Sequence, residues 1–295
     1  MCSLHILGRG FTHFMHGNSS MKTLALSMVA LALLIQPAAR GEEKITVKGS
    51  DTMVILAQRW AEKYMGNHQG VVIQVTGGGS GTGISALING ATDICNASRP
   101  MKRSEVDKLK QRYGTRGVEI KSALDGLSVY VNVESPIQEL SLGQLKDIYT
   151  GKITNWREVG GSNAKIILYG RENSSGTYVY FKDNVLMGED YTATMQSMPG
   201  TAAVVNAVGK DKAGIGYGGA AYGKGIRELK VKKDASAPGY APTLENIKSG
   251  NYPISRYLYM YVRNRPAGAL KEYIDWILSD EGQKIVTEVG YFPIR

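Results

Sequence analysis

The chain has 295 residues, of which 43% are apolar and 21% charged, and its formal net charge is +9. This composition excludes a disordered polypeptide, and the length favours about two domains. The one long apolar run, Leu24 to Ile35, excludes a multi-span membrane protein. The two cysteines, Cys2 and Cys95, are too few for a disulfide scaffold or a cysteine-based metal site.

Residues 1–41 are predicted to be an upstream extension followed by a signal peptide. Lys22 gives a basic start, the apolar run follows, and Ala38 to Gly41 supplies small residues for cleavage. The alternative is a membrane anchor, but 12 residues are too few to span a bilayer comfortably. No cysteine follows the run, so no lipid anchor is expected. The sequence therefore predicts export to the periplasm of a chain that begins near residue 42.

Removal of residues 1–41 lowers the net charge to +6 and leaves His68 as the single histidine. One histidine and one cysteine exclude a structural zinc site and leave little for a Ser-His-Asp triad, so we expect no metal and no cofactor. The densest basic stretch, Lys224 to Lys233, has no interleaved aromatic residues. It is typical of a solvated face rather than of a nucleic-acid-binding surface.

Strand and helix patterns alternate along the mature chain, which predicts parallel or mixed sheets covered by helices. The first elements expected are strand 44–48, helix 53–64, strand 71–75, a glycine loop over 77–83 leading into a short helix from 84, strand 92–97, helix 102–112 and strand 118–124. Apolar residues in helix 53–64 recur at i, i+3, i+4, i+7 and i+8, as on one face of an amphipathic helix. Ser50 or Asp51 is placed to cap its start.

The elements expected next are strand 127–133, helix 141–149, strand 165–169, helices 177–186 and 201–208, strand 215–217, an irregular connection over 224–253, strand 257–262, and helices 268–278 and 281–289. Boundary signals near residues 125 and 254 predict a discontinuous first lobe, 42–125 with 255–295. The second lobe, 126–254, is expected to be inserted between its halves.

Three loops, Gly49–Thr52, Gly79–Gly83 and Arg171–Thr177, share one chemistry, because each follows a predicted strand and opens a predicted helix. A helix N-terminus offers free backbone N–H groups and a partial positive charge to an anion. Serine and threonine hydroxyls add donors, and Arg171 adds a permanently charged fork. Each loop alone is typical of an ordinary helix cap. Together they predict an oxyanion held between two domains.

Enzyme functions are the alternatives from another class. Gly81 to Ala86 matches a G-x-G-x-x-A dinucleotide pattern with Glu105 about 20 residues further on. However, the predicted helix 102–112 takes Glu105 away from a strand end. A serine hydrolase or phosphoester-processing enzyme would need a base beside Ser80 or Ser175, and His68 lies in a polar turn.

Across residues 44–295 the chain resembles the periplasmic phosphate-binding proteins of ABC-type phosphate importers. The resemblance rests on the three loops, on Ala97-Ser98-Arg99-Pro100 and on Gly151-Lys152-Ile153-Thr154-Asn155-Trp156. It implies an α/β, two-lobed periplasmic-binding-protein fold of type II with the ligand in the cleft between the lobes. It also implies a monomeric receptor without catalytic activity that delivers inorganic phosphate to a membrane permease.

The resemblance places ligand-binding residues at Ser50, Asp51, Thr52, Ser80, Ser98, Arg99, Arg171, Ser175, Gly176 and Thr177. The chain departs from the family pattern in two places. Ser98 stands where an aspartate accepts the phosphate proton, and Asn173 stands where an aspartate orients the arginine.

These departures bear on selectivity, because an acceptor is what separates protonated phosphate from sulfate. Our hypothesis is that Asp51 takes over the acceptor role, and the alternative is that Asp51 only caps its helix. Arg99 either touches the ligand or pairs with a surface carboxylate. A receptor for sulfate or another oxyanion therefore stays open.

Overall fold

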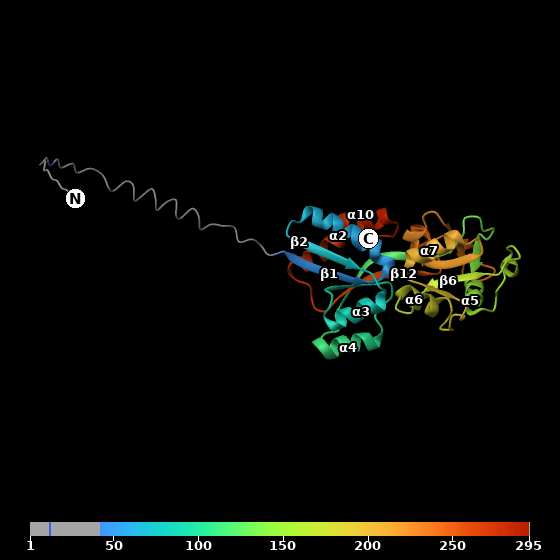
Figure 1. Ribbon diagram of the computed structural model, residues 1–295, viewed down its shortest axis with the longest axis horizontal. Helices are drawn as coiled ribbons and strands as arrows, with labels where there is room; N and C mark the ends of the chain where they lie inside the picture. Colours follow the sequence, from blue (N-terminus) through green and yellow to red (C-terminus); the bar gives the residue numbers. More distant parts are fainter. Residues whose placement is uncertain (1–11, 13–41, 295) are drawn as a thin grey trace, which may run out of the picture. The chain divides into compact units, whose positions relative to one another are not determined.

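The structure, a computed structural model, describes residue 12 and residues 42–294. The predicted extension and signal peptide lie outside the described residues, apart from residue 12. Residues 42–294 form a mixed α/β fold (Figure 1). Within that range no helix is both long and apolar enough to cross a membrane.

The first elements follow the predicted order. They are β1 (Glu43–Gly49), a short 3-10 helix η1 (Asp51–Met53), α2 (Val54–Asn67), β2 (Val71–Thr76), α3 (Ser80–Asn89), β3 (Ile94–Ala97), α4 (Arg103–Tyr113) and β4 (Val118–Val131). In Figure 1, α2 lies on one side of β1 and β2, and α3 and α4 lie on the other.

The middle of the chain adds β5 (Glu139–Ser141), α5 (Leu142–Thr150), η2 (Trp156–Val159), β6 (Ile167–Arg171), α6 (Gly176–Asn184), β7 (Gln196–Met198), α7 (Thr201–Lys210), β8 (Gly214–Gly219), η3 (Ala220–Tyr222), β9 (Arg227–Glu228), β10 (Lys230–Lys232), β11 (Gly239–Tyr240) and α8 (Leu244–Lys248). The chain then returns through β12 (Ser255–Val262) to α9 (Gly268–Ile277) and α10 (Asp280–Val289). Helix α10 packs beside α2 (Figure 1).

The main sheet has the strand order β2-β1-β3-β12-β4-β8-β6-β7, with β9 added to β4. Strands β2, β1 and β3 are parallel to one another, and so are β8, β6 and β7. Strands β12 and β4 are antiparallel to their neighbours and lie between these two groups. The mixed sheet confirms the predicted fold class.

Strand β4 is continuous, whereas the sequence predicts two strands separated at Asp125 and Gly126. Both residues pair with β12, Asp125 with Arg256 and Gly126 with Ser255, so the ladder is not interrupted there. From Leu127 onward β4 pairs with β8 instead. One strand therefore belongs to both halves of the sheet.

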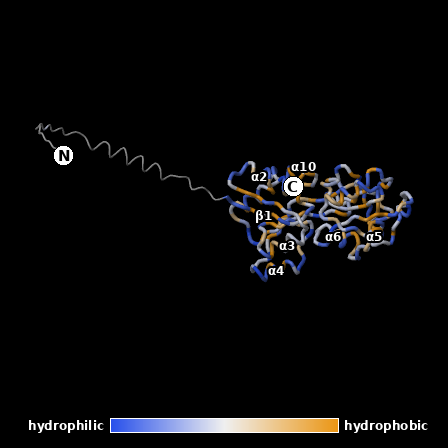
Figure 2. The backbone as a smooth tube through the Cα atoms, in the orientation of Figure 1, coloured by the Kyte–Doolittle hydropathy of each residue, from blue (hydrophilic) through white to orange (hydrophobic). Residues whose placement is uncertain are grey.

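Two large hydrophobic cores lie on either side of this shared strand. The first core is built from residues 45–123 and 258–291, including Trp60 on α2. The second core is built from residues 127–254, including Trp156 and Tyr217. Hydrophilic segments lie on the outer loops and along α4 (Figure 2). The predicted lobe boundaries at 125/126 and 254/255 stay a prediction, and the residue ranges of the two cores fall within the two predicted lobes.

Local sequence explains several helices directly. The predicted face of α2 is buried through Leu56, Ala57, Trp60, Ala61 and Tyr64. Helix α5 begins at a capping box, in which the hydroxyl of Ser141 accepts from the N–H of Gln144 and the Gln144 side chain reaches back. The capping role predicted for Ser50 or Asp51 is wrong. Neither side chain caps η1 or α2, because the Asp51 carboxylate is bonded to other loops.

Two further segments differ from the sequence prediction. Helix α3 begins at Ser80, so half of the expected glycine loop is helical. The expected irregular connection 224–253 contains β9, β10, β11 and α8. Strands β10 and β9 form against β5 and β4, which are distant in sequence, so local patterning did not predict them.

Candidate functional site

The candidate site lies where the predicted loops meet at the carboxyl ends of strands from both parallel groups. Such ends, at a point where strand order changes, are where open α/β sheets bind ligands. The loop after β1 carries Ser50–Thr52, α3 begins at Ser80 after β2, and Ser98 follows β3. From the other group, β6 ends at Arg171 and α6 begins at Gly176.

Four hydroxyl groups form a buried cluster, which we call the hydroxyl cluster: Ser80, Ser98, Thr52 and Thr177. Each of these residues is at most 1% exposed. The Oγ1 atoms of Thr52 and Thr177 are 2.7 Å apart, and Ser98 Oγ lies 3.4 Å from Thr177 Oγ1 and 3.3 Å from Ser80 Oγ. The cluster therefore joins loops that are up to 125 residues apart in sequence.

The start of α6 fits closely against this cluster. Ser175 caps the helix, and its hydroxyl accepts from the N–H groups of Thr177 and Tyr178. A Cβ at Gly176 would overlap Ser80 Oγ and lie 2.7 Å from Ser98 Oγ. Only glycine lets the N-terminal turn of α6 come this close to α3.

A second close approach joins the same two helices. Gly79 has a φ of +89°, and a Cβ there would lie 2.7 Å from the carbonyl oxygen of Ser174. That carbonyl accepts from the N–H of Gly81 at 2.9 Å. The glycines of the second loop therefore serve contact between backbones, as well as the start of α3.

Arg171 is buried and almost fully engaged. Its Nη2 donates to Asp51 Oδ2 at 2.6 Å and to Glu172 Oε1 at 2.8 Å, its Nε donates to Glu172 Oε2, and its Nη1 donates to Thr201 Oγ1. Burial opposes its charge, but the hydrogen bonds and charges of Glu172 and Asp51 still raise the pKa of Arg171. One Nη1 hydrogen of the five guanidinium donors is left for a further acceptor.

Asp51 ties three loops together. Its Oδ1 accepts from the N–H of Gly78 at 2.8 Å, and its carbonyl accepts from the Tyr222 hydroxyl at 2.7 Å. Burial and the charge of Asp51 raise the pKa of Tyr222 to about 12, so this hydroxyl stays a donor. Next to it, the buried Oγ of Ser50 has no hydrogen-bond partner among the described residues.

Glu172 is a residue that sequence reasoning missed. Burial tends to raise its pKa, but its bonds to Arg171 hold the pKa of Glu172 below its usual value. Glu172 thus supplies a carboxylate that orients Arg171, the role that the resemblance assigns to an aspartate at position 173, where this chain has Asn173. Its position directly after Arg171 was the available signal.

Arg99 is not brought to the hydroxyl cluster. Its guanidinium donates to both carboxylate oxygens of Glu105, at 2.8 and 2.7 Å, and to the carbonyl of Pro100. The Arg99 hydrogen bond and charge hold the pKa of Glu105 below its usual value, despite burial. Glu105 itself lies in α4, so it is not placed to contact a ribose.

A second missed arginine, Arg256, reaches the cluster from β12. Its Nη2 donates to Thr177 Oγ1 at 3.0 Å, and its Nη1 donates to the carbonyl of Ser98 at 3.0 Å. Its Nε and Nη2 bind Asp125 Oδ2 at 3.0 and 2.8 Å. No loop motif marks Arg256, which lies just before the predicted strand 257–262 and inside the observed strand β12.

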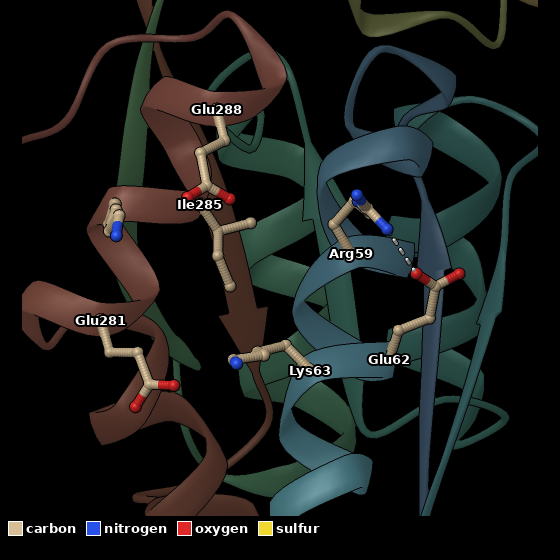
Figure 3. A pocket seen from close by; sticks show the side chains of 7 residues that line it. Arg59, Glu62, Lys63, Glu281, Ile285 and Glu288 are labelled. Atoms are coloured by element: carbon tan, nitrogen blue, oxygen red, sulfur yellow. Dashed lines mark hydrogen bonds and ion pairs between the residues drawn. The ribbon is translucent and has the colours of Figure 1, made fainter.

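A surface groove of about 450 Å³ lies elsewhere, between α2 and α10 (Figure 3). Its lining mixes both charges, and the drawn pair Arg59–Glu62 is mostly exposed to solvent. Solvent-exposed ion pairs of this kind contribute little to the free energy of unfolding. Within residues 42–294, no group of three or more His, Cys, Asp or Glu side chains could hold a metal ion.

The chain is similar in sequence to known proteins. A family model described as a PBP superfamily domain matches residues 35–281. The phosphate-binding protein PstS of Pseudomonas aeruginosa is 33% identical over 263 residues, which cover 83% of this chain and 81% of that protein. The PstS of Bacillus subtilis is 34% identical, over 87% of this chain and 84% of its own.

Solved structures are similar as well. A putative phosphate ABC transporter substrate-binding protein from Clostridium perfringens, with bound phosphate, has a TM-score of 0.78 and 30% identity. The match includes 86% of this chain and 100% of the Clostridium perfringens chain. An ABC-type phosphate transport receptor from Vibrio cholerae has a TM-score of 0.67 and 30% identity, over 84% of this chain and 99% of its own.

Proposed function

The chain belongs to the family of periplasmic phosphate-binding proteins of ABC-type phosphate importers, and from this membership we propose that it is a receptor for inorganic phosphate. The observation that carries the proposal is the hydroxyl cluster at the N-termini of α3 and α6, together with Arg171, which binds Asp51 next to Thr52 of the cluster. Hydroxyls and helix N-termini bind a compact oxyanion through hydrogen bonds and dipoles. The protein is proposed to act without catalysis.

Phosphate is proposed to bind among the loops that carry Ser50–Thr52, Ser80, Ser98, Arg171 and Ser175–Thr177. One hydrogen of Arg171 Nη1 and the hydroxyl of Ser50, both without a partner among residues 42–294, are donors available to it. Glu105 engages both terminal nitrogens of Arg99, so Arg99 is proposed to contribute at most through its buried Nε, which has no hydrogen-bond partner among the described residues.

We assign residues 42–125 with 255–295 to one lobe and residues 126–254 to the other. The separate hydrophobic cores support this division, and β4 and β12 connect the lobes. Closure then brings Asp51 to Arg171 and Gly81 to Ser174 across the cleft. An anion that contacts both lobes favours the closed form over the open form.

The receptor is proposed to be exported to the periplasm, to act as a monomer and to deliver phosphate to the membrane permease of an ABC importer. Family membership supports this assignment, as does the apolar run before residue 42. No nucleic-acid partner is proposed.

Calorimetric titration of residues 42–295 with phosphate tests the binding function. The ligand is first removed by partial unfolding and refolding. We expect one-to-one binding that Arg171→Met weakens by about a hundredfold or more, because truncating a buried charged partner costs roughly 2–5 kcal/mol. Arg59→Met, at the exposed pair with Glu62, is the matched control and should bind as the parent does. Failure of the parent protein to bind phosphate would reject the function.

Sulfate competes as a second candidate ligand because Ser98 and Asn173 replace two carboxylates. We propose that Asp51 supplies the acceptor for the phosphate proton. Each of its carboxylate oxygens accepts one N–H in the structure and keeps a further lone pair. Titration of Asp51→Asn with phosphate and sulfate tests this role. The parent should prefer phosphate by about a hundredfold. An unchanged preference in the variant would show that Asp51 is not the acceptor.

A phosphoester-processing enzyme is the alternative from another class. His68 Nδ1 donates to the carbonyl of Tyr64 at 2.8 Å, and the His68 ring stacks on the Tyr64 ring, so His68 is not beside Ser80 or Ser175. Incubation with a generic phosphomonoester should therefore give no turnover above buffer. Sustained turnover by the purified protein would favour the enzyme.

A further inference from the structure

Arg256 and Asp125 are two buried charged residues that the proposed binding function does not use directly. Their side chains are 3% and 0% exposed. They face each other on neighbouring strands, in direct register on β12 and β4. Asp125 Oδ1 also accepts from the N–H of Ala220 at 3.1 Å, so both of its oxygens are bonded. This packing fixes where the guanidinium points.

The guanidinium of Arg256 points at the hydroxyl cluster and fixes the direction in which the Thr177 hydroxyl can donate its proton. Arginine has five N–H donors and no acceptor. Thr177 Oγ1, which lies 3.0 Å from Nη2, must therefore accept from Arg256. A hydroxyl has only one proton, so the proton of Thr177 is directed away from Arg256. It can go only toward Thr52, Ser98 or a bound anion.

Backbone N–H groups fix the orientation of two neighbouring hydroxyls, those of Ser80 and Ser175, in the same way. Ser80 Oγ accepts from the N–H of Ser98 at 3.0 Å. Ser175 Oγ accepts from two N–H groups at the start of α6. Backbone N–H groups also donate only. Three hydroxyl oxygens of the site thus accept from fixed donors, so their own protons are directed away from those donors.

We propose that Arg256, held by Asp125, is a positioning residue of the oxyanion site that makes the Thr177 hydroxyl a donor to the anion. It does so without joining the ligand contacts itself. This inference rests on the proposed function, since it explains how one group of that site is oriented. Preorganised donors cost no reorientation when the anion binds, which is why their orientation affects affinity.

A double-mutant cycle on phosphate affinity tests the proposal. Thr177→Val removes the hydroxyl, and Asp125→Asn with Arg256→Gln removes both charges without leaving either one buried alone. In the parent, Thr177→Val should weaken phosphate binding about tenfold or more, as expected for a lost hydrogen bond to a charged group. In the charge-free background the same change should cost only about twofold. The coupling expected is therefore about fivefold, within the range for contacting residues.

Thr177→Ser is the conservative control, since it keeps the hydroxyl and should keep most of the affinity in the parent. If thermal denaturation shows that the charge-free variant is not folded, Arg256→Lys replaces it as the background. Lysine keeps a cation beside Asp125 but lacks the fork that reaches two acceptors at once. In that background Thr177→Val should again cost only about twofold in phosphate affinity.

Equal costs of Thr177→Val in the parent and in the folded background would overturn the proposal, because Arg256 would then serve packing alone. That result would leave phosphate binding by the parent intact, so it differs from failure of the proposed function. A parent protein that binds no phosphate would reject both.

Discussion

The candidate site has two arginine–aspartate pairs, and they are held in different ways. Arg256 and Asp125 lie on neighbouring strands whose ladder already places them opposite each other. Arg171, the last residue of β6, and Asp51, in η1 just after β1, form a loop pair across 120 residues of sequence. Strands β6 and β1 belong to different parallel groups. Asp125 is completely buried, whereas the side chain of Asp51 is 18% exposed.

This difference indicates different tasks. The strand pair stays together as long as the sheet is intact, so it can hold one guanidinium in a fixed direction. The loop pair joins two segments that no strand ladder holds together, so the closure proposed above would form and break it. Burial raises the pKa of Asp125 although Arg256 opposes this, which shows how strongly the surroundings disfavour an isolated charge there.

Asp125→Ala should break the strand pair with the largest effect on stability. It leaves the Arg256 guanidinium buried without its partner, which costs about 3–5 kcal/mol of unfolding free energy. Urea denaturation measures the loss. The combined change Asp125→Asn with Arg256→Gln should cost less than Asp125→Ala, and a larger cost would contradict the argument.

Asp51→Ala should break the loop pair at a smaller cost of about 2 kcal/mol. Arg171 keeps its two bonds to Glu172, so its charge is not left alone. The same urea titration measures this loss. A cost equal to that of Asp125→Ala would show that the loop pair is as permanent as the strand pair.

Glu105→Gln extends the comparison to Arg99, the arginine that the cluster does not use. It should cost about 1 kcal/mol at neutral pH and leave phosphate affinity unchanged. The folded pKa of Glu105 is below its usual 4.5, so its stabilisation is complete above that pH and is lost as pH falls through the folded value. The stability difference between parent and variant should therefore shrink in acid. A difference that is constant with pH would argue against the ion pair.

Glu62→Gln gives the smallest effect and sets the baseline for a solvent-exposed pair. Arg59 and Glu62 lie one helical turn apart on α2 and are each more than half exposed. We expect a change within about 0.5 kcal/mol, and a smaller one at high salt. A loss comparable to that of Asp51→Ala would mean that exposure does not separate these pairs.

The sequence by itself determined the elements that depend on neighbours along the chain. The buried face of α2 follows from apolar spacing, and α5 begins at Ser141 because a capping box is a local arrangement. The three loops rich in glycine and hydroxyl groups were visible for the same reason. The two-lobed fold followed from motifs in order, as the comparisons confirm.

Only the tertiary structure decided which charged side chains meet. A guanidinium on a long side chain binds whatever carboxylate the fold brings within reach, so Arg99 binds Glu105 while Arg256 enters the cluster. Asp51, 120 residues before Arg171, binds Arg171 for the same reason. Strand β4 crosses Asp125 and Gly126 without a break because β12, more than a hundred residues away, pairs with both. Local sequence has no access to such distant partners, and they fix the geometry of the site.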